Sequence, residues 1–387
     1  TTLFRSTFTG LGYGYYVVAV PGATLANAKS QYATLVSVHS TKVDADIKGD
    51  LPTVDKKVQV DGTGKDATDA KIGDTLTFTL TSTIPDMSAY DTYTFNFKDT
   101  LSKGLTFGQV KSVKVENVTL TENTDYTVTT PTASNNNTLT VAMKDFKTKQ
   151  QANAGKKITV TYTATLNENA VVGGAGNVNS AKIQYSNNPS TNGTGESEPS
   201  KVRVFTYGFT VDKYTGDQYT DAATRLAGAE FTLAHKDGSA ISFVQVSAGS
   251  ATANAVYRVA KAGETGTTTI TTPANGKVVF EGLKNGEYTL TETKAPAGYN
   301  KLASAIGVKV NGQNNGTDTT NATVTITYNN DNGNDYNQTA SNGVIPVQNK
   351  SGAILPGTGG MGTIAFTVIG VLVIALGVAW TLKRKNA

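Results

Sequence analysis

The sequence predicts an all-β protein made of tandem immunoglobulin-like β-sandwich domains, with a C-terminal transmembrane helix in the precursor. The composition is the first reason, because Thr, Asn, Gly, Val and Tyr are frequent and Leu and Met are scarce, which favours strands over helices. The second reason is a set of segments in which apolar and polar residues alternate. The third is an uncharged apolar run at residues 361–382, followed by basic residues.

The alternating segments recur between clusters of Gly, Asn, Pro and Asp. They are DTLTFTLTST (74–83), TYTFNFKD (92–99), KITVTYTATL (157–166) and TVTITY (323–328). A two-residue period places successive side chains on opposite faces of a strand. We therefore interpret these segments as half-buried strands of antiparallel sandwiches.

Changes in composition divide the chain. The polar stretch 186–200 precedes a new strand pattern and places a boundary near residue 207, whereas Pro52 and a charge run mark an earlier boundary near 48–57. The expected domains are 1–48, 49–207 and 208–350, followed by a C-terminal segment, 351–387. The first is too short for a whole sandwich, and it opens without a signal peptide. We interpret it as the C-terminal part of a truncated or processed N-terminal domain.

Charge and residue usage exclude several classes of function. The net charge of +4 falls to +1 without the basic cluster at 383–385, so nothing indicates nucleic acid as a partner. The absence of Cys excludes disulfides and thiol chemistry, and the two His residues, His39 and His235, are far apart in sequence. We therefore expect no metal, no cofactor and no His-based catalytic site, and predict that the protein is not an enzyme.

The apolar run at 361–382 is long enough to cross a bilayer as a helix, and Trp380 lies near its end, where interfacial aromatic residues are found. The basic residues after it, Lys383, Arg384 and Lys385, are expected to stay on the cytoplasmic side. This topology puts residues 1–360 outside the membrane.

A short motif precedes the run and consists of Leu355, Pro356, Gly357, Thr358 and Gly359. Together with the apolar run and the basic tail, it resembles the LPxTG sorting signal of Gram-positive surface proteins. The resemblance implies that a sortase cuts between Thr358 and Gly359 and joins the Thr358 carboxyl group to an amine. The helix then holds the precursor in the cytoplasmic membrane only until processing.

Residues 208–350 contain FTVDKYTGD, GLKNGEYTLTETKAPAGY and VIPVQNK in that order. This segment resembles the collagen-adhesin B-type domain of pilins and surface adhesins. In that family a lysine on the first strand forms an isopeptide bond with an asparagine on the last strand, promoted by a glutamate. The resemblance implies these roles for Lys213, Asn349 and Glu292.

Residues 49–207 resemble the other isopeptide-forming domain of backbone pilins, a D2-type or collagen-adhesin A-type sandwich. The resemblance rests on the motifs PTVDKK, FKDTLSKGLTF and NVNSAKIQYSN. By position they imply Lys56 and Asn179 as the bonded pair and Asp99 as the promoting acid. Lys57 and Asn177 remain the rival candidates.

The chemistry explains why these three residue types belong together. A lysine attacks only as the neutral amine, which burial favours, and a protonated acid polarises the asparagine amide before ammonia leaves. If the residues are solvated, they are instead ordinary surface and turn residues. In the absence of disulfides, a bond between Lys213 and Asn349 closes a loop of about 136 residues and stabilises the fold by about 4.7 kcal/mol or slightly more.

Backbone pilins also need a lysine that accepts the Thr carboxyl group of the next subunit. The usual Tyr-Pro-Lys pattern is absent, but VDADIK places Lys48 at the corresponding offset before Lys56, and Lys42 is the alternative. FTGLGYGYYVVAV (8–20) likewise resembles the closing strands of the N-terminal pilin domain.

The sequence is therefore identified as a member of the sortase-assembled major pilins. The implied function is that of a covalently polymerised, peptidoglycan-anchored pilus subunit at the cell surface, supporting adhesion. The implied partners are copies of itself, pilin and housekeeping sortases, peptidoglycan and a host surface ligand. The alternative is a singly anchored adhesin or accessory pilin, which would give one band on a denaturing gel instead of a ladder.

Overall fold

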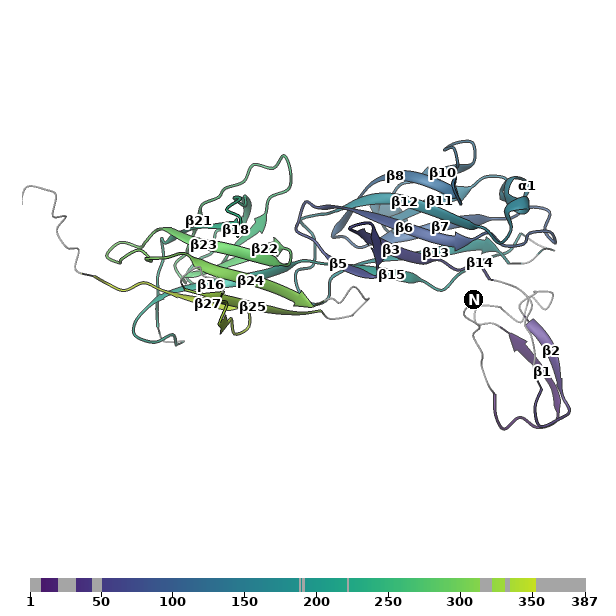
Figure 1. The fold of residues 1–387 in the computed structure, drawn as a ribbon, viewed down its shortest axis with the longest axis horizontal. Helices are drawn as coiled ribbons and strands as arrows, with labels where there is room; N and C mark the ends of the chain where they lie inside the picture. Colours follow the sequence, from purple (N-terminus) through teal and green to yellow (C-terminus); the bar gives the residue numbers. More distant parts are fainter. Residues whose placement is uncertain are drawn as a thin grey trace, which may run out of the picture.

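The computed structural model describes residues 8–19, 33–43, 51–187, 189, 192–220, 223–313, 322–330 and 335–352. Most of these residues form two β-sandwiches that lie end to end along the long axis of the molecule (Figure 1). We call strands β3–β15 the first sandwich and strands β16–β27 the second sandwich. A separate two-stranded antiparallel sheet precedes them, formed by β1 (Gly14–Ala19) and β2 (Ala33–Val38). The prediction of tandem β-sandwiches is confirmed.

The first sandwich consists of two sheets, named here after a central strand. In spatial order, the β12 sheet contains β4 (Thr63–Lys65), β3 (Asp55–Val60), β6 (Thr75–Thr83), β12 (Lys157–Leu166), β8 (Leu105–Val115) and β9 (Val118–Thr119). The β13 sheet contains β10 (Tyr126–Thr129), β11 (Thr138–Met143), β7 (Phe95–Leu101), β13 (Asn177–Ser186), β15 (Ser200–Phe205) and β5 (Ala67–Asp69), with β14 (Thr194–Glu196) paired to β13. The described helices are α1 (Phe146–Gln150) and two 3₁₀ turns, Ala133–Asn135 and Gln151–Asn153.

The second sandwich also consists of two sheets. The β16 sheet contains β17 (Thr224–Arg225), β16 (Tyr207–Thr215), β22 (Lys277–Leu283), β20 (Ala255–Val259) and β19 (Phe243–Ser247), with β27 (Val344–Gln348) paired in parallel to β16. The β23 sheet contains β21 (Ile270–Thr271), β18 (Glu230–His235), β23 (Gly286–Lys294), β24 (Ile306–Gln313), β25 (Thr323–Asn329) and β26 (Gln338–Thr339).

The four alternating segments correspond to β6, β7, β12 and β25. Strand β7 begins three residues later than expected, at Phe95, and continues to Leu101. The extension has a clear cause, because Leu101 pairs with Asn179 on β13 and so still belongs to the ladder. This continuation keeps Asp99 inside the strand.

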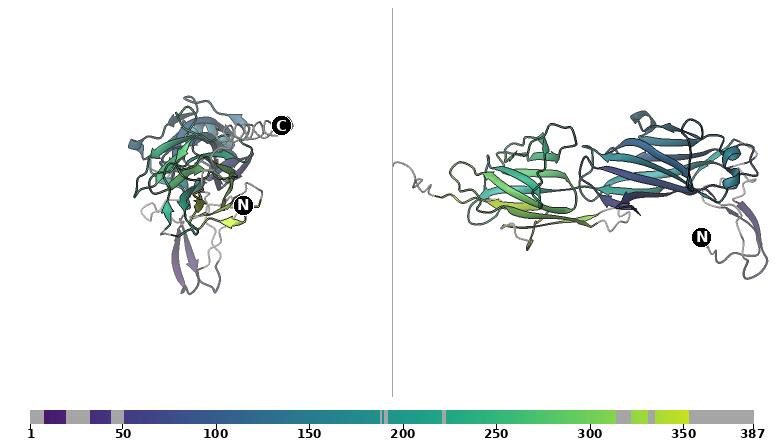
Figure 2. Two further views of the ribbon diagram at one scale, coloured as in Figure 1. Left: turned by 90° about the vertical axis from the view of Figure 1, so that its left-hand side faces the viewer. Right: turned by 45° about the horizontal axis from the view of Figure 1, so that its top comes forward.

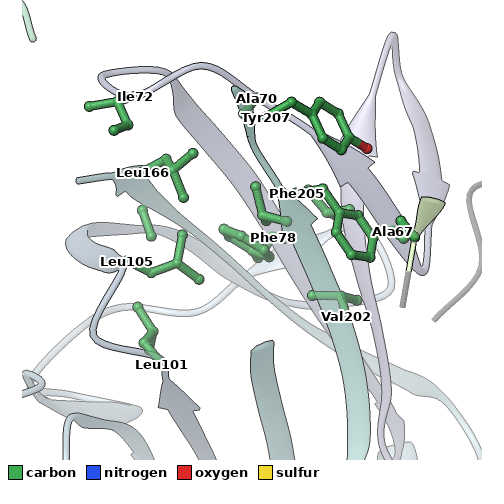
Figure 3. Packing of buried hydrophobic residues seen from close by; sticks show 14 of the residues in the cluster. Ala67, Ala70, Ile72, Phe78, Leu101, Leu105, Leu166, Val202, Phe205 and Tyr207 are labelled. Carbon is green, nitrogen blue, oxygen red and sulfur yellow. The ribbon is translucent and has the colours of Figure 1, made fainter. Parts of the chain in front are cut away.

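The two-residue period determines which side chains form the core. In β12, Ile158, Val160, Tyr162, Ala164 and Leu166 are all fully buried. Burial of each large apolar side chain contributes about 1.5–3 kcal/mol relative to exposure. Figure 3 shows part of the core of the first sandwich, where side chains from several strands meet.

The chain passes from one sandwich to the other through a single residue, Thr206, which lies between β15 and β16. Its hydroxyl donates to the carbonyl of Leu283 at 3.0 Å. Ile72 of the first sandwich donates its N–H to Gly282 of the second at 3.0 Å. Gly282 has φ +83°, and a Cβ there would lie 2.6 Å from the Ile72 side chain. The right view of Figure 2 shows the two sandwiches following one another along the molecule, whereas the left view looks along its long axis.

Three sequence predictions lie outside the described residues. They are the membrane span at 361–382, the sorting motif Leu355–Gly359 and the intersubunit candidate Lys48. Within the described part of the chain, none of the helices has the length and apolar character needed to cross a bilayer.

Candidate functional site

The first sandwich contains a buried cluster of a lysine, a carboxylate and an asparagine. Lys56 lies on β3, Asp99 on β7 and Asn179 on β13, and each occupies an inward position of its strand. All three are fully buried. Charged residues are almost never fully buried unless they are paired, so this burial needs a specific reason.

Tyr162 on β12 holds the three side chains together. Lys56 Nζ pairs with Asp99 Oδ2 and also donates to the Tyr162 hydroxyl at 2.9 Å. That hydroxyl donates to Asp99 Oδ2 at 2.5 Å and accepts from Asn179 Nδ2 at 2.6 Å. We call these four residues the first cluster.

Burial shifts the pKa values of Lys56 and Tyr162 in the first cluster. It lowers the pKa of Lys56 from 10.5 to about 8, although the charge of Asp99 and the hydrogen bond to it act in the opposite direction. The rings of Phe78 and Tyr162 lie 5.3 and 5.2 Å from Lys56 Nζ. Burial also raises the pKa of Tyr162 well above its usual value of 10. The lysine is therefore more easily neutralised than a solvated one, whereas the tyrosine keeps its proton.

The two rival candidates lie elsewhere. Lys57 is partly exposed, and its hydrogen bond to Asp66, at 2.6 Å, raises its pKa. Asn177 is buried, but its side chain binds backbone groups of Val171 and Val204. The structure therefore brings Lys56 and Asn179, rather than Lys57 and Asn177, to the buried carboxylate.

The second cluster consists of Lys213, Glu292 and Asn349. Lys213 lies on β16 and Glu292 on β23 of the opposite sheet, whereas Asn349 follows the last residue of β27. Lys213 pairs with Val347 in the parallel ladder, and the N–H of Asn349 donates to the carbonyl of Tyr214 at 3.0 Å. The side chains of all three residues are buried.

Glu292 contacts both of its partners directly. Its Oε1 lies 3.1 Å from Lys213 Nζ, and its Oε2 accepts from Asn349 Nδ2 at 2.9 Å. The N–H of Leu302 donates to the same Oε2 at 2.8 Å, and the carbonyl of Asn300 accepts from Asn349 Nδ2 at 2.8 Å. Burial lowers the pKa of Lys213 to about 8, and the Phe231 ring lies 5.7 Å from its Nζ.

Both clusters have the parts needed for an acyl transfer within the chain. A lysine poised to lose its proton is the nucleophile, the asparagine amide carbon is the electrophile, and a carboxyl group moves protons. The amide oxygens, Asn179 Oδ1 and Asn349 Oδ1, are buried and lack a hydrogen-bond partner among the described residues. The reacting side chains of both clusters are buried in the core, away from bulk water.

Sequence reasoning missed three contributors: Tyr162 and the backbone groups of Asn300 and Leu302. A signal for Tyr162 was present, because it shares the inward register of Val160 and Ala164, and a buried tyrosine hydroxyl needs a partner. The two backbone groups gave no signal, because their positions depend on the loop before β24.

Lys42 lies shortly after β2 with an exposed side chain, whereas Lys48, Thr358 and the other sorting residues are outside the described part. Where the structure describes the chain, no group of three or more His, Asp or Glu side chains is arranged to hold a metal ion.

Three family models match the chain in order. A model described as Gram-positive pilin backbone subunit 2, Cna-B-like domain, matches residues 72–189. A prealbumin-like fold domain model, SpaA, matches residues 217–325, and the LPXTG cell wall anchor motif matches residues 347–387. The first description gives a B-type relationship for the first sandwich, whose sequence motifs resemble those of the A-type instead. The anchor motif places the protein at the cell wall surface.

Relatives and solved structures agree with these models. The trypsin-resistant surface T6 protein of Streptococcus pyogenes is 26% identical over 279 residues, which cover 65% of this chain and 44% of that protein. The chain thus spans less than half the length of this relative. The 35 kDa C-terminal fragment of the major pilin GBS80 of Streptococcus agalactiae superposes with a TM-score of 0.54 at 23% identity, over 78% of this chain and 100% of the fragment.

The T6 backbone pilin of serotype M6 Streptococcus pyogenes has a TM-score of 0.53 at 17% identity, over 89% of this chain and 82% of that structure. At these identities the two solved structures establish the shared fold, and the family models carry the assignment. The backbone subunit model, the prealbumin-like model and the anchor motif, in this order on one chain, identify it as a member of the Gram-positive backbone pilins with an LPXTG cell wall anchor.

Proposed function

We propose that each sandwich forms one intramolecular isopeptide bond, between Lys56 and Asn179 in the first cluster and between Lys213 and Asn349 in the second. The observation that carries this proposal is the burial of a lysine, a carboxylate and an asparagine together, twice in one chain. A buried ion pair alone gives little net stability, because desolvation offsets the Coulomb attraction. A covalent bond would explain why the lysine and the carboxylate are buried together, and it removes the charge of the lysine permanently.

The reaction is a single turnover within one chain, so the protein is its own substrate. The lysine amine attacks the amide carbon, a carbon–nitrogen bond forms, and ammonia leaves. Asp99 and Glu292 are the promoting acids, since each pairs with the lysine of its cluster. This role fits a structural subunit better than an enzyme with an external substrate.

The chain is proposed to act as a pilus subunit that a pilin sortase polymerises head to tail. In this scheme the Thr358 carboxyl group is joined to Lys48 of the next subunit, with Lys42 as the alternative, and a housekeeping sortase finally attaches the polymer to peptidoglycan. The anchor motif at 347–387 and the backbone subunit model support the scheme. Adhesion to a host ligand is proposed as a role of the assembled polymer.

Intact-mass spectrometry of the full chain tests the two bonds. Each bond releases one ammonia, so the mass falls by about 17 Da per bond. We expect a deficit of two ammonias in the wild type and of one in Asn179→Ala or Asn349→Ala, with peptide mapping to identify the bonded residues. A wild-type mass equal to the mass calculated from the sequence, with no ammonia lost, would refute both bonds.

Wall extracts on a denaturing gel test the polymer separately. We expect a ladder of high-molecular-weight species that disappears in Lys48→Ala and remains in Lys42→Ala. A single band in the wild type would favour a singly anchored adhesin, and loss of the ladder only in Lys42→Ala would reassign the linking lysine.

A further inference from the structure

The first cluster separates its acid from its asparagine. In the antiparallel ladder between β7 and β13, Asn179 lies opposite Leu101 and Asp99 lies opposite Ala181, so the two residues are diagonal neighbours. Diagonal positions are about 7–8 Å apart. Asp99 Oδ2 contacts Lys56 and Tyr162, and Oδ1 has no hydrogen-bond partner among the described residues. Neither oxygen of Asp99 hydrogen-bonds Asn179.

The second cluster shows what the first cluster lacks. The two oxygens of Glu292 contact the two reacting nitrogens, Lys213 Nζ at 3.1 Å and Asn349 Nδ2 at 2.9 Å. One carboxyl group can therefore move a proton from the amine to the leaving nitrogen without help. Asp99 is one methylene shorter than a glutamate and has no such reach.

The Tyr162 hydroxyl occupies the gap. A tyrosine hydroxyl has one hydrogen to donate and two lone pairs to accept with. Here the hydrogen goes to Asp99 Oδ2 at 2.5 Å, and the lone pairs accept from Lys56 at 2.9 Å and from Asn179 Nδ2 at 2.6 Å. The hydroxyl thus touches the acid, the nucleophile and the leaving group at once.

We propose that Tyr162 is a catalytic residue of the first cross-link, and that its hydroxyl relays a proton from Asp99 to Asn179 Nδ2; this inference rests on the proposed isopeptide bond. The aspartate and the tyrosine hydroxyl together replace the single glutamate of the second cluster. Tyr162 therefore does more than fill the core.

The Lys56 ammonium gives one proton to Asp99, and the neutral amine attacks Asn179 Cγ to form the new bond. Asp99 then donates its proton to the Tyr162 oxygen, while Tyr162 gives its own hydrogen to Nδ2, so the Cγ–Nδ2 bond breaks and ammonia leaves. The second proton lost from Lys56 Nζ returns to Asp99, which can release it to the ammonia as ammonium.

Tyr162→Phe in the full chain is the first test. The ring that stacks on Phe78 at 5.3 Å stays, and only the hydroxyl is removed. We expect the mass deficit to fall from two ammonias to one, with Lys56 and Asn179 in separate peptides and the Lys213 bond intact. The matched control is Tyr288→Phe in the second sandwich. It removes the hydroxyl of a buried tyrosine that donates to the backbone carbonyl of Lys284, and both isopeptide bonds should still form.

Tyr162→Phe/Asp99→Glu distinguishes a relay from a structural role. The longer carboxylate can use the space of the missing hydroxyl and reach both nitrogens, as Glu292 does, so we expect the second ammonia loss to return. A double variant that stays unlinked while its Lys213 bond forms would overturn the relay. A Tyr162→Phe chain that links as fast and as fully as the wild type would also overturn it.

The two proposals fail in different ways. If the wild type shows no ammonia loss at the first cluster, the isopeptide bond itself is refuted, and Tyr162 has no reaction to catalyse. If the wild type links there and Tyr162→Phe links equally well, only the relay is refuted.

Discussion

The two clusters contain the same reacting residue types, but they lie differently in their sandwiches. In the first, Lys56 belongs to the β12 sheet and Asn179 to the β13 sheet, so the proposed bond joins the two sheets across the core. In the second, the bond joins β16 to the end of β27, which are neighbouring parallel strands of one sheet. The same chemistry therefore constrains different parts of the fold.

The consequence concerns the path of tension. The chain enters the second sandwich on β16 and leaves it after β27, so a bond between Lys213 and Asn349 carries tension past almost the whole sandwich. In the first sandwich, β14 and β15 follow Asn179 and lie between the bond and Thr206. These two strands stay in the path of the force, held by ladders to β13 and β5.

The largest expected effect is mechanical. Pulling the wild-type chain should release only the segment after Asn179 from the first sandwich, about 26 residues or roughly 90 Å, and no segment between Lys213 and Asn349. Asn349→Ala should add a release of roughly 460 Å, because the chain of about 136 residues between Lys213 and Asn349 can then extend. Single-molecule force spectroscopy measures both lengths. Equal, small releases from both wild-type sandwiches would contradict the difference in topology.

The next effect is on thermal stability, where the two sandwiches should behave alike. The loops closed by the bonds are of similar length, about 120 and 140 residues, so each bond should contribute about 4–5 kcal/mol. Asn179→Ala and Asn349→Ala each keep the lysine–carboxylate pair, and calorimetry should show the affected transition lowered by roughly 10–20 °C. A large decrease in the transition temperature of only one variant would show that strain in the folded sandwich, rather than loop closure, determines how much each bond stabilises it.

A smaller effect depends on pH and appears only without the bond. In Asn349→Ala, Lys213 keeps a pKa of about 8 in the fold against 10.5 in the unfolded chain, because burial disfavours its charge. The unfolded chain then binds more protons between these values, so the free energy of unfolding rises as the pH increases from about 8 to 10.5, by about 3 kcal/mol relative to the wild type. Below pH 8 both states hold the proton and the difference is constant.

Denaturant melts of wild type and Asn349→Ala at several pH values measure this difference. Asn179→Ala should show the same window, because the pKa of Lys56 is also lowered to about 8. The opposite slope, with the variant losing stability toward pH 10.5, would mean that the lysine is stabilised as an ion in the fold.

The smallest expected effect on stability concerns the contact between the two sandwiches. It tests whether each sandwich forms its isopeptide bond independently of the other. Asp69 accepts hydrogen bonds from the backbone and side-chain amides of Asn285, at 2.7 and 3.1 Å. Asp69→Ala should lower stability by about 1–3 kcal/mol and leave both ammonia losses unchanged. Calorimetry and intact mass measure the two quantities, with the exposed Glu122→Ala as the control. Loss of either cross-link in Asp69→Ala would show that the sandwiches do not form their bonds independently.

The sequence by itself indicated four of the strands, and the resemblance of its motifs to pilin domains implied the residues of each cluster. Lys56 shares the inward register of Val54 and Val58, Asp99 that of Phe97 and Leu101, and Lys213 that of Val211, because a strand alternates strictly between its faces. The same rule applied to PTVDKK distinguishes Lys56 from Lys57, since these neighbours must point to opposite faces. The two-residue strand period and the order of the motifs are therefore enough to choose between residues that are neighbours along one strand.

Tertiary structure decided what depends on neighbours across strands. Asn177 and Asn179 share one face of β13, and only the ladder to β7 and the position of Tyr162 bring Asn179 to the acid while Asn177 binds backbone groups near β15. Strand order also decided whether each bond lies within a sheet or across the core. These relations join residues that are far apart in sequence. A local pattern cannot predict them, because it determines the face on which a side chain lies but not which strand will lie opposite.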